Sequence, residues 1–297
     1  MVNDLAHLGH TMIYISTGGI SDQPATKTAL DFYNHGILNI ELSGGTHSEN
    51  YQAELADLPH GVKLQVHNYF PPAKIPFVFN LASVDAEIAE LSVNHVRKAM
   101  DLSVVLENRF YAFHAGFRVD PKVSDLGKRL NKKSLLDRKI ALEIFAERIT
   151  LLSDEAEELG VTLLIENNVL SKANFAVYGE DPFLFTSPGE ILNFMAQAPT
   201  NVGLLLDVAH LKVSSNTLNF NLIDAHEMLS PWIEAYHLSD NDGTKDSNDL
   251  IYDGSWFWPY LKKGSQFYTL EIYNTSCAEL VAQGDLVAKK LSEIKLS

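Results

Sequence analysis

The sequence predicts one closed (β/α)8 barrel, in which parallel strands alternate with helices around a central axis. Short apolar runs bounded by turn residues are typical of strands buried on both faces, and stretches with helical spacing of apolar residues separate them. Strict alternation favours parallel strands joined by right-handed crossovers. With 297 residues, each strand and helix unit has about 37 residues, which suits a barrel. We therefore expect a single domain, residues 1–297, with long loops after the strands.

The predicted strands, in chain order, cover residues 11–17, 37–43, 63–70, 110–117, 162–168, 202–210, 233–240 and 267–273. Helical spacing of apolar residues is clearest in residues 84–107, 135–159 and 277–294. The segment 187–190 reads Ser-Pro-Gly-Glu. It predicts a helix start with Ser187 as N-cap, a proline at the first helical position and Glu190 at the third. We expect that helix to end near Ala198.

Composition excludes several classes of protein. Apolar residues make up 46% of the chain, and 38 Asp+Glu against 23 Lys+Arg give a net charge of −15. Such a chain can form a core, whereas the acidic balance argues against sequence-independent binding to nucleic acid or anionic lipid. The single cysteine, Cys277, cannot form an internal disulfide. Because residues 1–10 lack a signal-peptide pattern and no apolar run approaches ~18 residues, we expect a cytoplasmic protein outside membranes.

Metal-competent side chains interrupt the apolar strands near their carboxyl ends. They are His67, His114, Glu166, Asp207, His210, His237 and Glu271. In a barrel these strand ends meet in one pocket. Buried carboxylates that share a pocket repel one another, and a divalent cation offsets this repulsion. Each residue alone is compatible with a structural hydrogen bond or a helix cap, but their concurrence on six strands favours a metal site.

Five segments carry a specific resemblance, namely residues 114–116 (His-Ala-Gly), 165–167 (Ile-Glu-Asn), 206–210 (Leu-Asp-Val-Ala-His), 236–240 (Tyr-His-Leu-Ser-Asp) and 270–272 (Leu-Glu-Ile). In this order, on these strands, the chain resembles the xylose isomerase-like TIM-barrel superfamily over essentially its whole length. That superfamily contains sugar and sugar-phosphate isomerases and epimerases, inosose dehydratases and class II apurinic endonucleases.

The resemblance implies a metal held by Glu166, Asp207, His237 and Glu271. This ligand set suits Mn²⁺, Mg²⁺, Co²⁺ or Zn²⁺ without selecting one. It also implies that Glu166 and Glu271 relay a proton at a carbon next to a carbonyl, as isomerases and epimerases require. His210 would then hydrogen-bond a substrate oxygen. The expected function is a metal-dependent sugar or sugar-phosphate isomerase or epimerase.

Two alternatives remain open. The endonucleases of the superfamily use three metals; His67 and His114 match the first additional site, and His210 and Asp246 match part of the second. Asn248, however, stands where their motif has a histidine, and an amide is a poor zinc ligand. Cations in the loops are also too sparse for several phosphates: Arg118, Lys172, Lys212 and Lys245. The second alternative is a catalytically inactive barrel that binds a sugar.

Candidate substrate contacts lie in the loops after the strands. Arg118 is the best candidate for a single phosphate, and Lys172, Lys245 and Asn168 are further candidates, although solvated surface charges would look the same. Glu41 could contact substrate or brace the pocket. Two long loops, residues 69–80 and 169–186, carry aromatic side chains that could stack on a sugar or pack on the barrel: Phe70, Phe77, Phe79 and Tyr178, with Trp256 and Trp258 further along. We expect a small-molecule partner, with nucleic acid disfavoured and a homo-oligomer left open.

Overall fold

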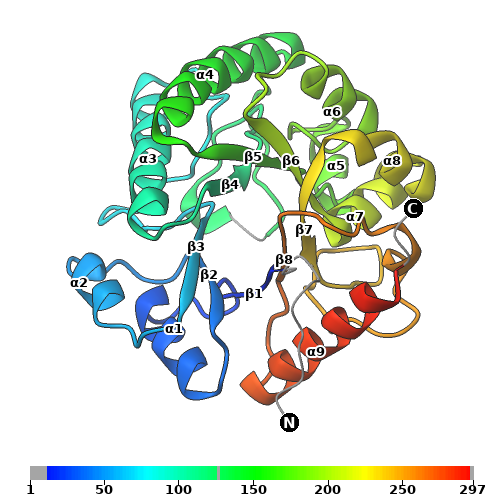
Figure 1. The fold of residues 1–297 in the computed structure, drawn as a ribbon. Helices are drawn as coiled ribbons and strands as arrows, with labels where there is room; N and C mark the ends of the chain where they lie inside the picture. Colours follow the sequence, from blue (N-terminus) through cyan, green and yellow to red (C-terminus); the bar gives the residue numbers. More distant parts are fainter. Residues whose placement is uncertain (1–11, 126–127, 295–297) are drawn as a thin grey trace.

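A computed structural model describes residues 12–125 and 128–294. Its strands form a closed parallel barrel in chain order, which confirms the predicted fold (Figure 1). The strands are β1 (Met12–Ser16), β2 (Asn39–Ser43), β3 (Lys63–His67), β4 (Phe110–His114), β5 (Thr162–Glu166), β6 (Val202–Asp207), β7 (Ile233–Leu238) and β8 (Phe267–Leu270). β8 pairs with β1 and closes the sheet.

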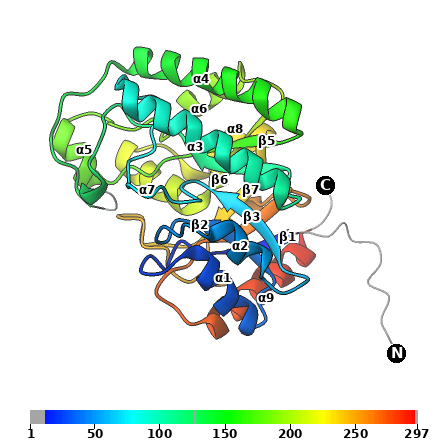
Figure 2. The ribbon, with the colours of Figure 1, turned by 90° about the vertical axis from the view of Figure 1, so that its left-hand side faces the viewer.

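Helices surround the barrel on the outside (Figures 1 and 2). They are α1 (Ala25–Asn34), α2 (Tyr51–Ala56), α3 (Ala86–Val105), α4 (Arg138–Leu159), α5 (Lys172–Tyr178), α6 (Pro188–Met195), α7 (Val208–Leu218), α8 (Leu222–Leu229) and α9 (Cys277–Glu293). The predicted helices at residues 84–107, 135–159 and 277–294 correspond to α3, α4 and α9.

Local sequence explains where the long helices begin and end. The Asp85 carboxylate accepts hydrogen bonds from the backbone N–H groups of Glu87 and Ile88 at the start of α3. Ser276 and Glu279 form a capping box at the start of α9. Gly160 ends α4 in a left-handed conformation, with φ 67°, which glycine adopts at little cost. The caps satisfy backbone groups that the helix itself leaves unpaired.

Several predicted boundaries are wrong. The strand predicted over residues 202–210 ends at Asp207, because the Asp207 side chain accepts the His210 N–H at 2.7 Å and caps α7. α6 begins at Pro188 as expected, but it ends at Met195 rather than near Ala198, and Ser187 makes no side-chain cap. Glu190 instead accepts the Phe185 N–H at 2.7 Å. The strand predicted over residues 37–43 ends at Ser43 as expected, whereas the remaining strands stop one to three residues short of their predicted ends. Thr11 lies outside the described residues.

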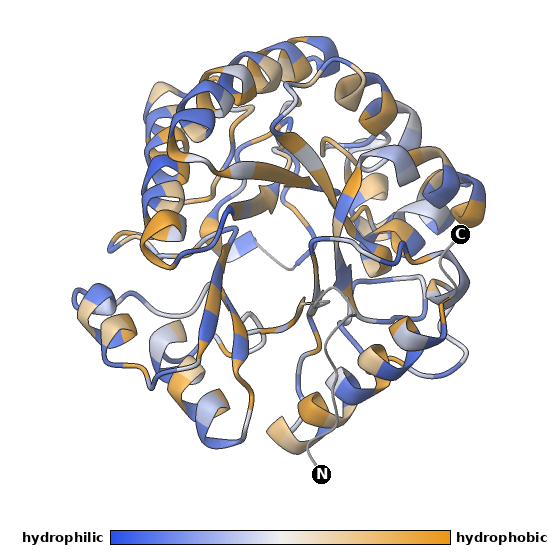
Figure 3. Ribbon diagram, viewed as in Figure 1, coloured by the Kyte–Doolittle hydropathy of each residue, from blue (hydrophilic) through white to orange (hydrophobic). Residues whose placement is uncertain are grey.

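Inward-facing residues fill the barrel in layers. A largely hydrophobic layer lies toward the amino ends of the strands, formed by Tyr14, Ala112, Leu164, Leu205, Ala235 and Phe267. Outward-facing residues of the same strands, such as Ile165 and Leu206, pack instead into the larger core under the helices. In Figure 3 β5 and β6 are mostly hydrophobic, whereas β2, β3 and the helices mix polar and apolar residues. Two residues further along the chain, the inward positions become polar.

Among residues 12–125 and 128–294, the helices are all too short or too polar to cross a membrane.

Candidate metal centre

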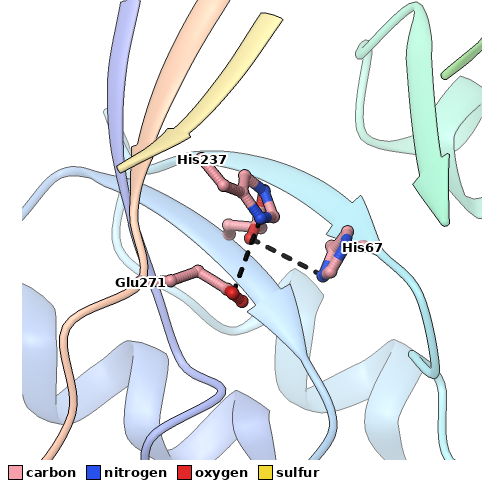
Figure 4. Close-up of side chains that lie close together, drawn as sticks. His67, His237 and Glu271 are labelled. Carbon is pink, nitrogen blue, oxygen red and sulfur yellow. Dashed lines mark hydrogen bonds and ion pairs between the residues drawn. The ribbon is translucent and has the colours of Figure 1, made fainter. Parts of the chain in front are cut away.

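Strand register brings the polar residues together at the carboxyl ends of the strands. The pairing of β4 with β5 places His114 beside Glu166, and the pairing of β6 with β7 places Asp207 beside His237. Glu271 directly follows β8. These residues lie on the inward parity of their strands, so their side chains converge in the barrel mouth. Figure 4 shows this convergence for His67, His237 and Glu271.

The four predicted ligands form one buried cluster. One ligand atom from each of Glu166, Asp207, His237 and Glu271 lies within 4.8 Å of the others. Two further groups meet the same criterion: His67, His114 and Glu166, which shares Glu166 with the first, and Glu41, His67, His237 and Glu271, which shares His237 and Glu271 with it. Glu166 Oε2 lies 2.8 Å from His67 Nε2 and 3.3 Å from His114 Nδ1, while its Oε1 lies 3.3 Å from His237 Nδ1. Glu166 therefore stands between two sets of metal-competent atoms.

Unpaired polar atoms mark the centre of this cluster. Eight buried side-chain atoms of the described residues have no hydrogen-bond partner, and four of them lie in the two groups that share Glu166: His114 Nδ1, Glu166 Oε1, Asp207 Oδ2 and His237 Nδ1. A buried polar atom without a partner costs about 1–3 kcal/mol, so four in one place require compensation. Oxygen and imidazole nitrogen atoms are the donors that divalent transition metals accept. The residues present thus fit a divalent cation.

The protein alone holds the cluster in an unusual charge state. Burial raises the pKa of Asp207 to about 7, and the neighbouring carboxylates of Asp246 and Glu166 add to the shift. Burial acts in the same direction on Glu166, but the imidazoles of His114, His237 and His67 outweigh it and hold its pKa well below the usual range. His114 is the most accessible member of the cluster, with 26% of its side chain exposed. Burial lowers the pKa of His114 to about 4, so the ring is a neutral potential ligand at pH 7.

His210 and Asp246 form a pair at the edge of the mouth. Asp246 Oδ2 lies 3.2 Å from His210 Nε2, and His210 Nδ1 lies 2.9 Å from the backbone oxygen of Asn167. Asp246 is partly accessible, with 23% of its side chain exposed. Asn248 is buried and adopts a left-handed conformation with φ 49°. The groups of metal-competent atoms found in the described chain include neither His210 nor Asp246.

The four predicted substrate contacts differ in availability. Arg118 is only 6% exposed, and its guanidinium donates to the Glu180 carboxylate at 2.7 Å and to the backbone oxygen of Leu136 at 2.9 Å. Asn168 donates to the backbone oxygen of Leu184 at 2.9 Å. Both side chains therefore brace loops. Lys172 and Lys245 are exposed, so their role as substrate contacts stays a prediction.

Aromatic residues of the predicted loops divide into two groups. Phe70, Phe79 and Trp258 are buried within the large core, which is a packing role. Phe77, Tyr178 and Trp256 are only partly buried against the cores. The second predicted loop also contains α5. Only the partly buried group therefore has aromatic surface available to a ligand.

Beneath the metal-competent atoms lies a polar layer that sequence reasoning identified only in part. Glu41 was a candidate, but Gln65 and Thr269 were missed, although both donate to Glu41 Oε2, at 2.6 and 3.0 Å. The signal was present in the sequence. Both residues are polar, lie within apolar runs, and precede His67 and Glu271 by two residues, so they share the same inward face.

Comparisons with known proteins agree with this architecture. The uncharacterized protein MJ1614 of Methanocaldococcus jannaschii is 28% identical over 222 residues, covering 72% of this chain and 73% of that protein. A D-tagatose 3-epimerase-like protein superposes with a TM-score of 0.71 at 18% identity, covering 95% of this chain and 97% of the other. An L-ribulose 3-epimerase superposes with a TM-score of 0.67 at 16% identity, covering 95% of each chain. At these identities the two structures support the fold.

Residues 23–263 match the sequence model of the xylose isomerase-like TIM barrel. The match covers most of the chain and includes Glu166, Asp207 and His237. The chain therefore belongs to the xylose isomerase-like TIM barrel family.

Proposed function

We propose that this protein is a metal-dependent sugar or sugar-phosphate isomerase or epimerase. One observation carries the proposal: unpaired buried atoms of Glu166, Asp207 and His237 converge with Glu271 at the barrel mouth. These residues would hold one divalent ion, Mn²⁺, Mg²⁺, Co²⁺ or Zn²⁺. Such an ion supplies polarisation of a substrate carbonyl and stabilises negative charge on its oxygen. The epimerase-type proteins that share the fold support this choice.

The two glutamates would move the proton. In a reaction at a carbon next to a carbonyl, one carboxylate removes the proton and a second group returns it. Glu166 and Glu271 are suited to these roles because they approach the centre from different strands. Ser16 Oγ and the Tyr273 hydroxyl each lie 3.4 Å from Glu271 Oε1. Both hydroxyls can donate to the carboxylate and hold it toward the substrate, with Lys172 and Lys245 as candidate contacts for a sugar phosphate.

The test is solvent deuterium uptake into a panel of ketose and aldose sugars, free and phosphorylated, with purified protein loaded with Mn²⁺ in D₂O. We expect deuterium to enter at least one sugar at the carbon next to its carbonyl. Glu271→Gln should abolish that uptake. Glu143→Gln on α4, whose side chain is 58% exposed, is the matched control and should retain it. Absence of uptake across the panel would overturn the proposal.

A second candidate function rests on the group formed by His67, His114 and Glu166. Because Glu166 belongs to both groups, the mouth could hold two neighbouring metals, an arrangement that suits phosphodiester hydrolysis. Metal analysis separates the candidates, since one ion per chain supports the isomerase and two support the hydrolase. Nicking of abasic DNA without deuterium uptake by any sugar would favour the hydrolase over the isomerase or epimerase.

A further inference from the structure

Glu41 places a buried negative charge directly behind the candidate metal centre. The side chain comes from β2 and is fully buried. Its Oε2 accepts hydrogen bonds from Gln65 Nε2 at 2.6 Å and from Thr269 Oγ1 at 3.0 Å, and lies 3.2 Å from His237 Nε2. A buried carboxylate is strongly unfavourable unless donors surround it. His237 is one of the donors that this oxygen requires.

These contacts decide which nitrogen of His237 carries a proton. An ionised carboxylate can only accept, so the imidazole Nε2 next to Glu41 must be the donor. A metal ion can bind His237 only where the ring carries no proton, so Nδ1 is the nitrogen left to bind it. Nδ1 faces the opposite way, 3.3 Å from Glu166 Oε1 and 3.6 Å from Glu271 Oε2. Glu41 therefore turns the unprotonated nitrogen toward the other predicted ligands.

The second oxygen of Glu41 faces another histidine of the cluster. Oε1 has no hydrogen-bond partner in the described chain and lies 3.8 Å from His67 Nδ1. The opposite nitrogen, His67 Nε2, lies 2.8 Å from Glu166. The His67 and His237 rings have centroids 4.6 Å apart. One carboxylate thus lies within 3.8 Å of two imidazoles, those of His67 and His237, whose rings lie close together in Figure 4.

We propose that Glu41 is a positioning residue that holds His237 as the Nε2–H tautomer and selects Nδ1 as its metal-binding atom. The proposal rests on the metal site of the proposed function, but not on the sugar reaction. Carboxylates that accept from ligating histidines raise metal affinity by orienting the ring and increasing its basicity. A brace that acted only by packing would not require charge at this position.

Zinc affinity tests the requirement for charge. Apo protein is titrated with Zn²⁺ in competition with a chromophoric chelator, for wild type, Glu41→Gln and Thr269→Val. Glu41→Gln preserves shape and a carbonyl acceptor but removes the charge, and it should weaken zinc binding by about 10-fold or more. Thr269→Val removes a donor from the same oxygen and leaves the charge, and it should bind zinc almost as wild type does. Equal affinities for wild type and folded Glu41→Gln would overturn the proposal.

A second measurement needs no variant at position 41. Nitrogen-15 spectra of the histidine rings in the zinc-loaded wild-type protein should show a proton on His237 Nε2 and none on Nδ1, with the signal assigned by its loss in His237→Gln. A proton on Nδ1 would contradict the assignment even if Glu41→Gln failed to fold. Zinc binding with the expected tautomer but no deuterium uptake by any sugar would remove the proposed reaction and leave the role of Glu41 intact.

Discussion

The two ends of the barrel interior are built from the same strands but have opposite chemistry. On β5, Leu164 faces inward in the hydrophobic layer and Glu166 faces inward two residues later. β6 repeats the change with Leu205 and Asp207, and β7 repeats it with Ala235 and His237. The hydrophobic layer leaves no buried side-chain polar atom unpaired among the described residues, whereas the polar side chains at the mouth leave several unpaired. Stability and binding chemistry are thus separated along the barrel axis, as expected for this architecture.

Without a metal ion, the buried and unpaired polar atoms at the mouth are energetically unfavourable. Removing one carboxylate from the mouth relieves repulsion between like charges, whereas removing apolar volume from the lower layer only loses packing. Variants at the mouth should therefore lose activity and keep their stability, whereas variants in the hydrophobic layer should lose stability and keep the properties of the mouth.

Glu271→Gln at the mouth should produce the largest effect. We expect deuterium uptake to fall by about 10³-fold, in the range for loss of a positioned acid or base. The free energy of unfolding of the metal-free protein should not fall, because a buried charge has been removed. Urea unfolding and deuterium uptake on the same preparation check both expectations. Wild-type uptake would contradict the role of Glu271.

Leu205→Ala in the hydrophobic layer should show the reverse pattern. Leu205 is fully buried, so truncation should lower the free energy of unfolding by about 2–5 kcal/mol. Zinc affinity of the folded fraction should stay unchanged. Leu205→Met, which nearly conserves volume, is the control and should cost less than about 1.5 kcal/mol. A loss of zinc affinity would show that the two ends are not separable.

Buried histidines in the mouth and on α3 have pKa values shifted in opposite directions. In the mouth, carboxylates outweigh burial and raise the pKa of His67 and His237. His95 on α3 is buried, stacks on Tyr69, and donates from Nε2 to the backbone oxygen of Asn68 at 2.8 Å. Burial lowers the pKa of His95 to about 4.

As the pH falls, His95 of the unfolded chain becomes protonated near pH 6.5, whereas His95 of the folded protein stays neutral until the pH approaches about 4. Stability from neutral His95 is therefore present above pH 6.5 and is lost as the pH falls toward about 4, at a total cost of about 3 kcal/mol. His95→Gln keeps a donor and should reduce the difference in unfolding free energy between pH 7 and pH 4.5. An unchanged difference would rule out His95 as an acid-sensitive group.

Addition of a metal ion should give the smallest of these changes in the free energy of unfolding. Zn²⁺ at about 100 times its Kd should raise the free energy of unfolding by about 2.7 kcal/mol. Asp207→Asn, which removes a predicted ligand while keeping its side-chain shape, should abolish most of that gain. Thermal unfolding with Zn²⁺ or with a chelator measures the effect. Equal stabilisation of wild type and Asp207→Asn would place the zinc elsewhere.

Much of the candidate site could be predicted because barrel strands have a fixed parity. Glu166, Asp207 and His237 interrupt apolar runs, and convergence at the strand ends follows from topology. The boundary at Asp207 was missed because its side chain caps α7, a local hydrogen bond that competes with an apolar continuation of the strand. Arg118 was a reasonable substrate contact by position. Its actual partner, Glu180, is distant in sequence and approaches only when the loops fold together.

The barrel, the order of its strands and the residue types at its mouth follow from the sequence, because alternation and strand parity are local properties of the chain. The unpaired atoms at the mouth and the nitrogen of His237 that faces its centre could be identified only from the tertiary structure. Those features depend on distances between β2, β5 and β7, which are set by strand register and burial. The partnership of Glu41 with His237, 196 positions apart, is therefore a property of the closed barrel.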